Sequence, residues 1–244
     1  MERQSHCALS DTRAKIDPSR TACRAAPLAR GGRNRWAAVV AIVAFIACAA
    51  HAATPRYTAN FAVEFDPDAG LAHAAIAISP DTGRVSKLDM LMPAARYRNV
   101  SGSGSVARSG ERIVWEVPKA GGELKYDVVI DHKRADGAYD ARMTPEWVIV
   151  RGDELFPPAK IRSTRDSESS SRLAIKLPKG WTDRESGYRL ASDGRFIVVN
   201  PSYSFDRPVG WIAAGDLFTR SESIGSIDYR VTGPKGQGLI VSRF

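Results

Sequence analysis

Two histidines, His73 and His132, follow the first 52 residues, and they are the starting point for any metal chemistry. A zinc hydrolase of the His-Glu-x-x-His type needs two imidazoles one helical turn apart and a glutamate that activates the metal-bound water. His73 and His132 lie far apart in strand-like segments, and neither has a second histidine or a carboxylate at helical ligand spacing. The sequence therefore predicts two surface or half-buried strand histidines, no metal site and no cofactor.

Other motifs of catalysis and ligand binding are incomplete. Ser103 lies between two glycines, but a Gly-x-Ser-x-Gly nucleophile elbow is absent from the sequence. Asp66 and Asp68 begin like a calcium loop, but Ala77 stands where the closing glutamate belongs, so this segment is predicted to be a turn. The glycine-rich segment 233–238 has neither dinucleotide-binding spacing nor a phosphate-binding loop. We therefore predict that this chain is not itself an enzyme.

Three aspartates lie near His132 in the sequence: Asp131, Asp136 and Asp140. Paired carboxylates can act as general acid and base wherever folding brings them together, so this role stays open. The Asp136-Gly137 pair is typical of a hairpin turn, and a charged turn is the favoured interpretation. Asp136 and Asp140 are kept as candidate residues of a binding surface.

Four tryptophans follow residue 52 and could form a platform for a peptide or a carbohydrate. Trp115 and Trp147 lie within alternating apolar segments, where packing in the core is the usual role of an indole ring. Trp181 follows a Pro-Lys-Gly turn sequence, and Trp211 follows Gly210. Trp181 and Trp211 are therefore the tryptophans predicted to lie on a binding surface.

The elements that position these residues are predicted to be strands. Apolar and polar residues alternate with a period of two, clusters of Gly, Pro, Asp and Ser separate the segments, and no amphipathic helix of about 12 residues is evident. This pattern predicts an all-β protein, either one large β-sandwich or two small packed sandwiches. The expected strands are 57–65, 71–78, 84–92, 112–117, 123–132, 146–151, 172–177, 195–200, 210–214, 227–232 and 239–242.

A polar, hydroxyl-rich stretch suggests how these strands are divided. Residues 157–171 begin with two prolines and continue with a run rich in Ser, Arg and Asp, which buries little and predicts a surface loop or a linker. Residues 53–156 would form the first β-sandwich part and residues 172–244 the second. The Ser-Gly repeat at 101–105 is likewise expected to be a flexible loop.

The first 52 residues have the parts of a secretory signal peptide. Eight basic and three acidic residues precede Trp36, an apolar run follows, and the segment closes on Ala50-His51-Ala52. A basic region, an apolar core and a small-x-small end are the signals for export and cleavage, here after Ala52. The protein is therefore expected to be periplasmic or secreted. The alternatives are an uncleaved membrane anchor and a lipoprotein modified at Cys48.

Cleavage would change the chemical character of the chain. The whole sequence has 35 basic and 27 acidic residues, but only 27 and 24 of these lie beyond residue 52. This near balance, without a stripe of basic and aromatic residues, argues against a nucleic-acid partner. All three cysteines, Cys7, Cys23 and Cys48, lie in the leader, so the mature protein is expected to have no disulfide. Contact with a membrane is expected only through an uncleaved N-terminal segment.

Several short segments together resemble the non-catalytic N-terminal β-rich region of M61-type (glycyl aminopeptidase-like) bacterial metallopeptidases. The resemblance extends over most of residues 55–240, although the Pro-Gly pair that the family has before the tyrosine at position 97 is missing. It implies a periplasmic protein whose longer relatives continue into a zinc domain, and no catalytic residue carries over to this chain. The segments are 57–65, 91–97, 124–128, 139–142, 147–156 and 205–215.

The function expected from the sequence is that of an exported, non-catalytic β-sandwich module that binds another protein or a peptide, or that positions a substrate. The alternative is a truncated or interrupted zinc aminopeptidase of the same family that lacks its catalytic domain. In that case the segment 233–244 is where the reading frame would depart.

Overall fold

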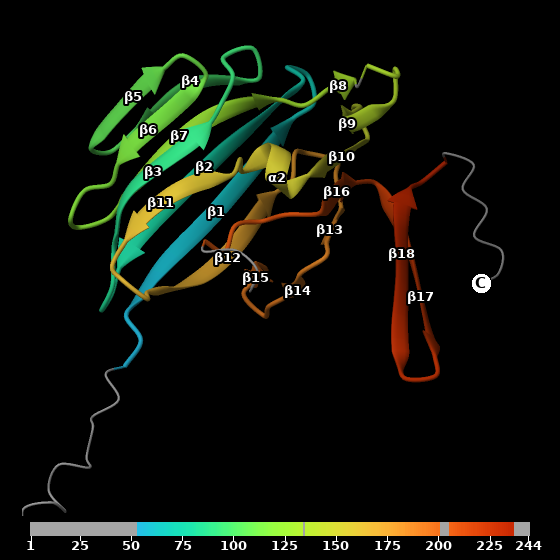
Figure 1. The fold of residues 1–244 in the computed structure, drawn as a ribbon. Coiled ribbons are helices and arrows are strands. Elements are labelled where there is room, and N and C mark those ends of the chain that lie inside the picture. Colours follow the sequence, from blue (N-terminus) through green and yellow to red (C-terminus); the bar gives the residue numbers. More distant parts are fainter. Residues whose placement is uncertain (1–52, 134, 201–204, 237–244) are drawn as a thin grey trace, which may run out of the picture. The chain divides into compact units, whose positions relative to one another are not determined.

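The computed structural model describes residues 53–133, 135–200 and 205–236, and Figure 1 shows the strands that dominate this part of the chain. The described residues contain one short helix, α2, of four residues, so the predicted all-β class is confirmed. The predicted signal peptide, its anchor and lipoprotein alternatives, the three cysteines and the expected strand at 239–242 lie outside the described residues. Among the described residues, no helix combines the length and the apolar character that crossing a membrane requires.

The largest sheet has seven strands in the order β14-β15-β12-β1-β2-β7-β4. Neighbouring strands are antiparallel except β1 and β12, which pair in parallel although more than a hundred residues separate them in the chain. The strands are β1 (Arg56–Asp66), β2 (Leu71–Pro80), β4 (Tyr97–Gly102), β7 (Gly122–Val129), β12 (Glu168–Lys176), β14 (Arg189–Leu190) and β15 (Phe196–Val198).

The first strand shows how the alternating pattern selects a buried face. Every second residue of β1, from Tyr57 to Phe65, is almost fully buried, whereas the residues that alternate with them are more exposed. The chain then reverses into β2 through a turn in which the Asp66 carboxylate accepts a hydrogen bond from the Ala69 amide. The segment that begins like a calcium loop is therefore a turn, as predicted.

A second sheet has four strands in the order β11-β3-β6-β5. Its apolar side chains Leu88, Ile113 and Trp115 are buried in the same hydrophobic cluster as those of β1, so the two sheets share a core as expected for a sandwich. The Trp115 indole N–H donates to the Ser103 carbonyl at 2.7 Å and fixes the link between β4 and β5. The strands are β3 (Val85–Leu91), β5 (Ser105–Ser109), β6 (Arg112–Glu116) and β11 (Ala159–Ser163).

Two segments expected to be loops are mostly strand. Within 157–171, β11 pairs with β3 and the first residues of β12 pair with β1, because main-chain hydrogen bonding requires no apolar side chains. Within 101–105, only Ser103 and Gly104 lie between β4 and β5. Strands from both expected parts, 53–156 and 172–244, therefore belong to one sheet.

A third sheet of five strands has the order β13-β16-β10-β9-β8. Val148 and Val150 of its central strand β10 are fully buried, and the short helix α2 (Gly152–Leu155) follows this strand directly. Trp147, which was expected in the core, is only half-buried at the start of β10. The strands are β8 (His132–Lys133), β9 (Tyr139–Met143), β10 (Trp147–Arg151), β13 (Asp183–Ser186) and β16 (Trp211–Gly215).

The last two strands, β17 (Leu217–Ile224) and β18 (Ile227–Pro234), form a two-stranded hairpin of their own. They pair along their whole length, from Leu217 opposite Pro234 to Ile224 opposite Ile227. The sequence pattern predicted β18 but missed β17, because Thr219 to Ser223 contains no apolar residue.

Candidate functional site

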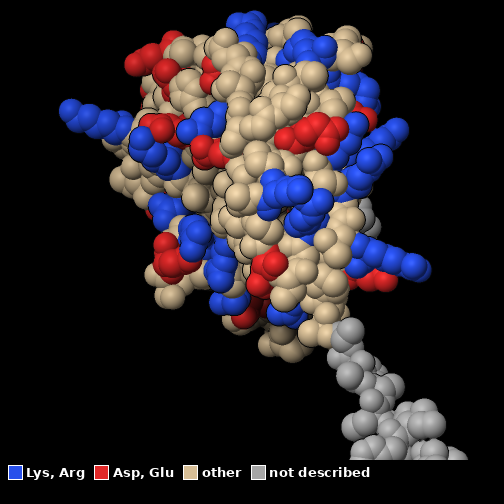
Figure 2. Space-filling model, turned by 90° about the vertical axis from the view of Figure 1, so that its left-hand side faces the viewer, with Lys and Arg blue, Asp and Glu red and all other residues tan. Residues whose placement is uncertain are grey.

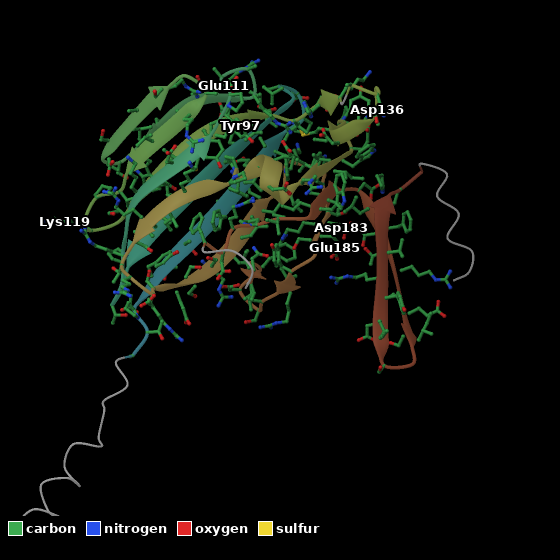
Figure 3. All side chains as sticks on the ribbon, viewed as in Figure 1. Tyr97, Glu111, Lys119, Asp136, Asp183 and Glu185 are labelled. Atoms are coloured by element: carbon green, nitrogen blue, oxygen red, sulfur yellow. The ribbon has the colours of Figure 1, made fainter. Side chains whose placement is uncertain are left out.

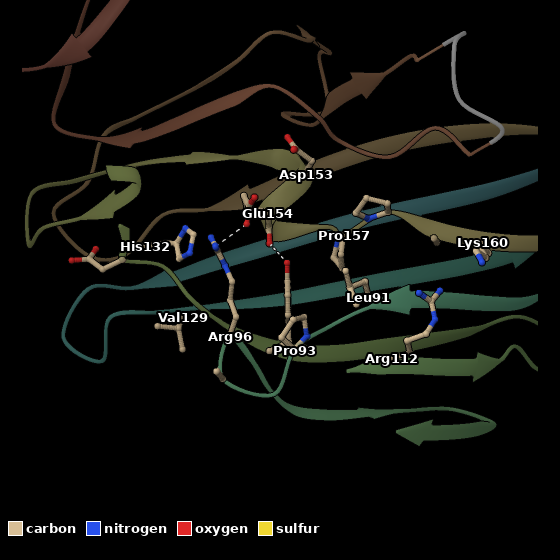
Figure 4. Close-up of a pocket in the computed structure, with 15 residues that line it drawn as sticks. Leu91, Pro93, Arg96, Arg112, Val129, His132, Asp153, Glu154, Pro157 and Lys160 are labelled. Carbon is tan, nitrogen blue, oxygen red and sulfur yellow. Dashed lines mark hydrogen bonds and ion pairs between the residues drawn. The ribbon is translucent and has the colours of Figure 1, made fainter. Parts of the chain in front are cut away.

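A cavity among the described residues has a volume of about 790 Å³, within the range usual for small-ligand sites. It lies between the segment that joins β3 to β4 and the segment that runs from α2 into β11 (Figure 4). Most of its wall is apolar. The lining residues are Leu91, Pro93, Ala95, Arg96, Tyr97, Arg112, Val129, Asp131, His132, Asp153, Glu154, Pro157, Pro158, Ala159 and Lys160.

Side chains from distant segments hold the α2 wall of the cavity in place. A four-residue helix is too short to be stable alone, and its last carbonyls need donors from elsewhere. Three successive carbonyl groups at its C-terminal end each accept a hydrogen bond from a different side chain. The bonds are Tyr97 Oη to Glu154 O (2.8 Å), Tyr126 Oη to Leu155 O (2.9 Å) and Arg207 Nη1 to Phe156 O (3.0 Å).

The two tyrosines of this arrangement are neutral over a wide pH range. Burial is the main influence that raises the pKa of Tyr97 and of Tyr126 above the ordinary value of 10.0. Their rings also contact each other edge to face, with centroids 6.0 Å apart. Both hydroxyls therefore stay protonated and remain hydrogen-bond donors to α2 at physiological pH.

An ion pair connects the two walls of the cavity. Arg96 Nη1 lies 2.8 Å from Glu154 Oε2, and the two side chains are only 14% and 29% exposed. Arg96 Nε and Nη2 are buried and have no acceptor among the described residues. Because a partly buried ion pair loses little strength to solvent screening, it fixes the relative position of the segments that carry Arg96 and Glu154.

Charged side chains of both signs form the rim. His132 Nδ1 donates to Asp140 Oδ1 at 2.6 Å, and Arg112 Nε donates to Asp89 Oδ1 at 2.7 Å. The rim therefore offers donors and acceptors around an apolar interior, an arrangement suited to a ligand with an apolar group and polar ends. On the face shown in Figure 2, Lys and Arg side chains are likewise interspersed with Asp and Glu.

The two tryptophans predicted to lie on a binding surface differ in exposure. Trp181 is only 8% exposed, so the expectation of an exposed ring is wrong: its ring packs beside Phe65, and its indole N–H donates to the Pro145 carbonyl. Trp211 is 52% exposed, with the Arg151 guanidinium 5.9 Å from the ring centroid. Neither tryptophan lines the large cavity.

The expected hairpin is present, with Asp136 in its turn and Asp140 in the strand β9 that follows. Strands β8 and β9 are antiparallel, and the Asp136 carboxylate in the turn between them accepts a hydrogen bond from the Ala138 amide (Figure 3). Asp140 approaches the cavity indirectly, because it pairs with His132, which lines the rim. The structure therefore joins Asp140 to the cavity through His132.

The second histidine belongs to a separate polar group on the seven-stranded sheet. His73 and Asn99 both donate to the Asp127 carboxylate, at 2.7 and 2.6 Å. Desolvation is the largest single influence on Asp127 and raises its pKa, but the hydrogen bonds from Asn99 and His73 and the charge of His73 together outweigh it, so the pKa lies below the ordinary value of 3.8. Both histidines are about half-exposed strand residues, as predicted. In the described part of the chain, no group of three or more His, Cys, Asp or Glu residues could hold a metal ion.

The residues that define the cavity were not singled out as site residues by the sequence. Leu91 to Tyr97 carry part of the resemblance to M61-type peptidases, and Pro157-Pro158 marked an expected loop, but neither segment contains a catalytic motif. The partnership of Arg96 with Glu154 joins residues 58 positions apart and leaves no signal in local spacing. The available sign in the sequence was Pro93, two residues after Leu91, together with Pro157-Pro158, because proline has no backbone N–H.

Comparisons with known proteins identify the fold but not a family. No protein-family model matches the sequence, and no curated protein matches it. Among solved structures, an aminopeptidase N family protein from Idiomarina loihiensis is similar over 71% of this chain and 32% of its own, with a TM-score of 0.51 and 13% identity. Aminopeptidase A of Legionella pneumophila, solved with aspartic acid, is similar over 68% of this chain and 22% of its own, with a TM-score of 0.36 and 10% identity.

The first of these similarities places the chain in a structural class. The chain spans about a third of the Idiomarina loihiensis protein. At 13% identity the likeness shows the fold alone, so the class is an all-β fold that also occurs within a peptidase chain.

Proposed function

We propose that this chain is an exported, non-catalytic β module associated with a peptidase, and that its cavity of about 790 Å³ binds an apolar segment of a peptide or protein. The cavity is the observation that carries the proposal. The likeness to a third of an aminopeptidase N family protein supports the association with peptidases. The role is to bind or position a peptide, and chemistry would belong to another domain or protein.

The walls favour an apolar side chain over a polar one. Pro93, Pro157 and Pro158 line the cavity and have no backbone N–H, so this part of the wall presents few donors. Leu91 is 49% exposed and adds apolar surface that no other described side chain covers. A bound peptide would place an apolar side chain against Leu91 and leave its amide groups near the charged rim.

Fluorescence of anilinonaphthalene sulfonate, which brightens in apolar sites, tests this proposal. We expect the purified protein to bind the dye and N-acetyl-leucyl-phenylalanine amide to displace it, whereas N-acetyl-diglycine amide should not. The Leu91→Ser variant should bind the dipeptide about tenfold more weakly, since burying a leucine contributes about 1.5–3 kcal/mol.

Leu190 supplies the matched control, because it is 50% exposed, close to the 49% of Leu91, and does not line the cavity. The Leu190→Ser variant should bind like the unchanged protein. Equal losses in both variants, or no displacement by the apolar dipeptide, would exclude the cavity as the binding site.

The relation to M61-type peptidases is part of this proposal. Its support is the set of sequence segments that resemble the N-terminal region of that family, including residues 91–97, five of which line the cavity. Sequencing the DNA downstream tests whether a frame encoding His-Glu-x-x-His follows, as the truncated-peptidase alternative requires. Aminopeptidase turnover by the purified chain that a chelator abolishes would contradict the non-catalytic role.

Export of the protein is the remaining part of the proposed function. The basic and apolar character of residues 1–52 supports a periplasmic or secreted location. Cell fractionation followed by N-terminal sequencing should find a soluble protein that begins at Ala53. An intact N-terminus in the membrane fraction would indicate an anchor instead, and a lipid on Cys48 would indicate a lipoprotein.

A further inference from the structure

The β17–β18 hairpin is amphipathic along its outer half. Its register places Ile224 opposite Ile227, Glu222 opposite Tyr229 and Arg220 opposite Val231. Because side chains alternate between the faces of a strand, these six residues share one face. The other face carries only polar residues over the same length: Thr219, Ser221, Ser223, Asp228, Arg230 and Thr232.

Side chains of the polar face interact with one another and with the neighbouring strand β13. Thr219 and Thr232 hydroxyls are 3.0 Å apart, and the Ser223 hydroxyl donates to the Asp228 carboxylate. Arg230 Nη2 lies 3.2 Å from the carboxylate of Glu185, which Figure 3 labels beside the hairpin. This ion pair turns the polar face toward β13, so the apolar face points away from it.

The apolar face is open to solvent. Ile224, Ile227 and Tyr229 are 50%, 56% and 42% exposed, and they are three of the eight large hydrophobic residues with this degree of exposure in the described part of the chain. A two-stranded hairpin is at best marginally stable in water unless another layer covers it. Clustered exposed apolar residues on a structural projection are typical of an interaction surface.

The charges on this face indicate which partner fits. Arg220 and Glu222 lie on neighbouring levels of β17 and are 3.6 Å apart within the chain. Two hairpins can pack with these faces in contact and their strands running in opposite directions, related by a twofold axis at the level of Ser221. In this arrangement Arg220 of each copy lies over Glu222 of the other. The same axis sets Tyr229 over Val231 and Ile224 over Phe218, which is half-buried at the hairpin base. The face is thus complementary to itself in both charge and apolar character.

We propose that the apolar face of the β17–β18 hairpin is an interface between two copies of this chain. The interface is small, because few residues on each copy are covered, and stable complexes bury about 800 Å² per partner. The dimer therefore forms reversibly with rising concentration. It does not depend on the cavity or on peptide binding.

Sedimentation equilibrium of the purified protein from micromolar to millimolar concentration tests the proposal. We expect a monomer–dimer equilibrium that the Ile224→Ser and Ile227→Ser variants weaken by about tenfold or more, because each removes an apolar side chain from the interface. Leu190→Ser is the matched control, with 50% exposure at a site outside the hairpin, and should dimerise like the unchanged protein.

Charge variants test the twofold arrangement without removing apolar contacts. Arg220→Glu leaves only acidic groups at these two positions, and Glu222→Arg leaves only basic ones, so each variant alone should dimerise less well. An equimolar mixture of the two should recover association, because each copy then faces opposite charges. A protein that stays monomeric throughout, or a dimer that none of these variants changes, would overturn the proposal.

Discussion

Replacing Tyr126 by phenylalanine should destabilise the fold through the loss of one oxygen atom. Tyr126 is 2% exposed, and its hydroxyl donates to the Leu155 carbonyl at 2.9 Å in a buried environment. Tyr126→Phe keeps the ring and its packing, but it leaves the Leu155 carbonyl without this donor. A buried carbonyl that loses its partner costs about 1–3 kcal/mol. We expect the free energy of unfolding to fall by about that amount.

Urea denaturation followed by tryptophan fluorescence measures this change, with the slope of free energy against urea expected to stay constant. Tyr139→Phe is the matched control, because Tyr139 is 41% exposed and its hydroxyl has no hydrogen bond to another described residue. Its loss should change the free energy of unfolding by less than about 0.5 kcal/mol. If both variants unfold at the same urea concentration, the carbonyl-capping role of Tyr126 is wrong.

A second tyrosine tests whether the α2 carbonyls are held as a unit. Tyr97→Phe removes the donor to Glu154 O, the carbonyl next to that of Leu155. Neighbouring groups in one hydrogen-bond network are rarely additive. The free energy of unfolding that the Tyr97→Phe/Tyr126→Phe double variant loses should therefore differ from the sum of the two single losses by about 0.5 kcal/mol or more. Strict additivity would mean that the two hydroxyls hold α2 independently.

Three further predictions concern other parts of the fold. Gly215→Ala should lower the free energy of unfolding by more than about 2 kcal/mol, because φ is +135° and a Cβ there would lie 2.3 Å from the Glu146 carbonyl oxygen. Gly225→Ala is the control in the same urea denaturation: its φ is +64° but the space around it is open, so the loss should be about 1 kcal/mol. Burial raises the pKa of Tyr57 to about 12, so the stability that its neutral hydroxyl contributes is complete below pH 10 and is lost as the pH rises toward 12. Tyr57→Phe should therefore flatten the alkaline decline of the urea midpoint, and a decline as steep as in the unchanged protein would contradict this prediction. Asn99→Gly should raise the pKa of Asp127 in an NMR titration, because it removes a hydrogen-bond donor to the carboxylate, and glycine tolerates the φ of +50° at this position. A constant pKa would show that His73 alone holds the pKa of Asp127 below the ordinary value.

The alternating pattern was enough to place the strands whose faces differ in polarity. The predicted segments 57–65 and 71–78 match β1 and β2 to within two residues at each end. Polar strands were missed: β11 contains Lys160 and Arg162, and β17 contains Arg220 and Glu222, so neither shows a continuous apolar face. Main-chain pairing with β3 and β18 makes them strands, and pairing of this kind has no signature in the residues themselves.

The burial of single residues was also predicted correctly where it depends on local alternation and wrongly where it depends on distant segments. Trp115 was predicted in the core from its alternating neighbours and is fully buried. Trp181 was predicted on the surface from its turn sequence, yet Phe65 and the Pro145 carbonyl, both distant in the chain, enclose it. A local pattern reports the secondary structure around a residue, but not which distant segment covers it.

The sequence by itself determined the all-β class, the turn at Asp66, the charged hairpin at Asp136 and the strand positions of His73 and His132. Each of these depends on residues close together in the chain, where side-chain alternation and turn preferences act. Only the tertiary structure decided that β12 lies beside β1, that Arg96 meets Glu154 across a cavity and that the apolar face of β17–β18 is uncovered. These features arise from contacts between segments far apart in the chain, and no local spacing encodes them.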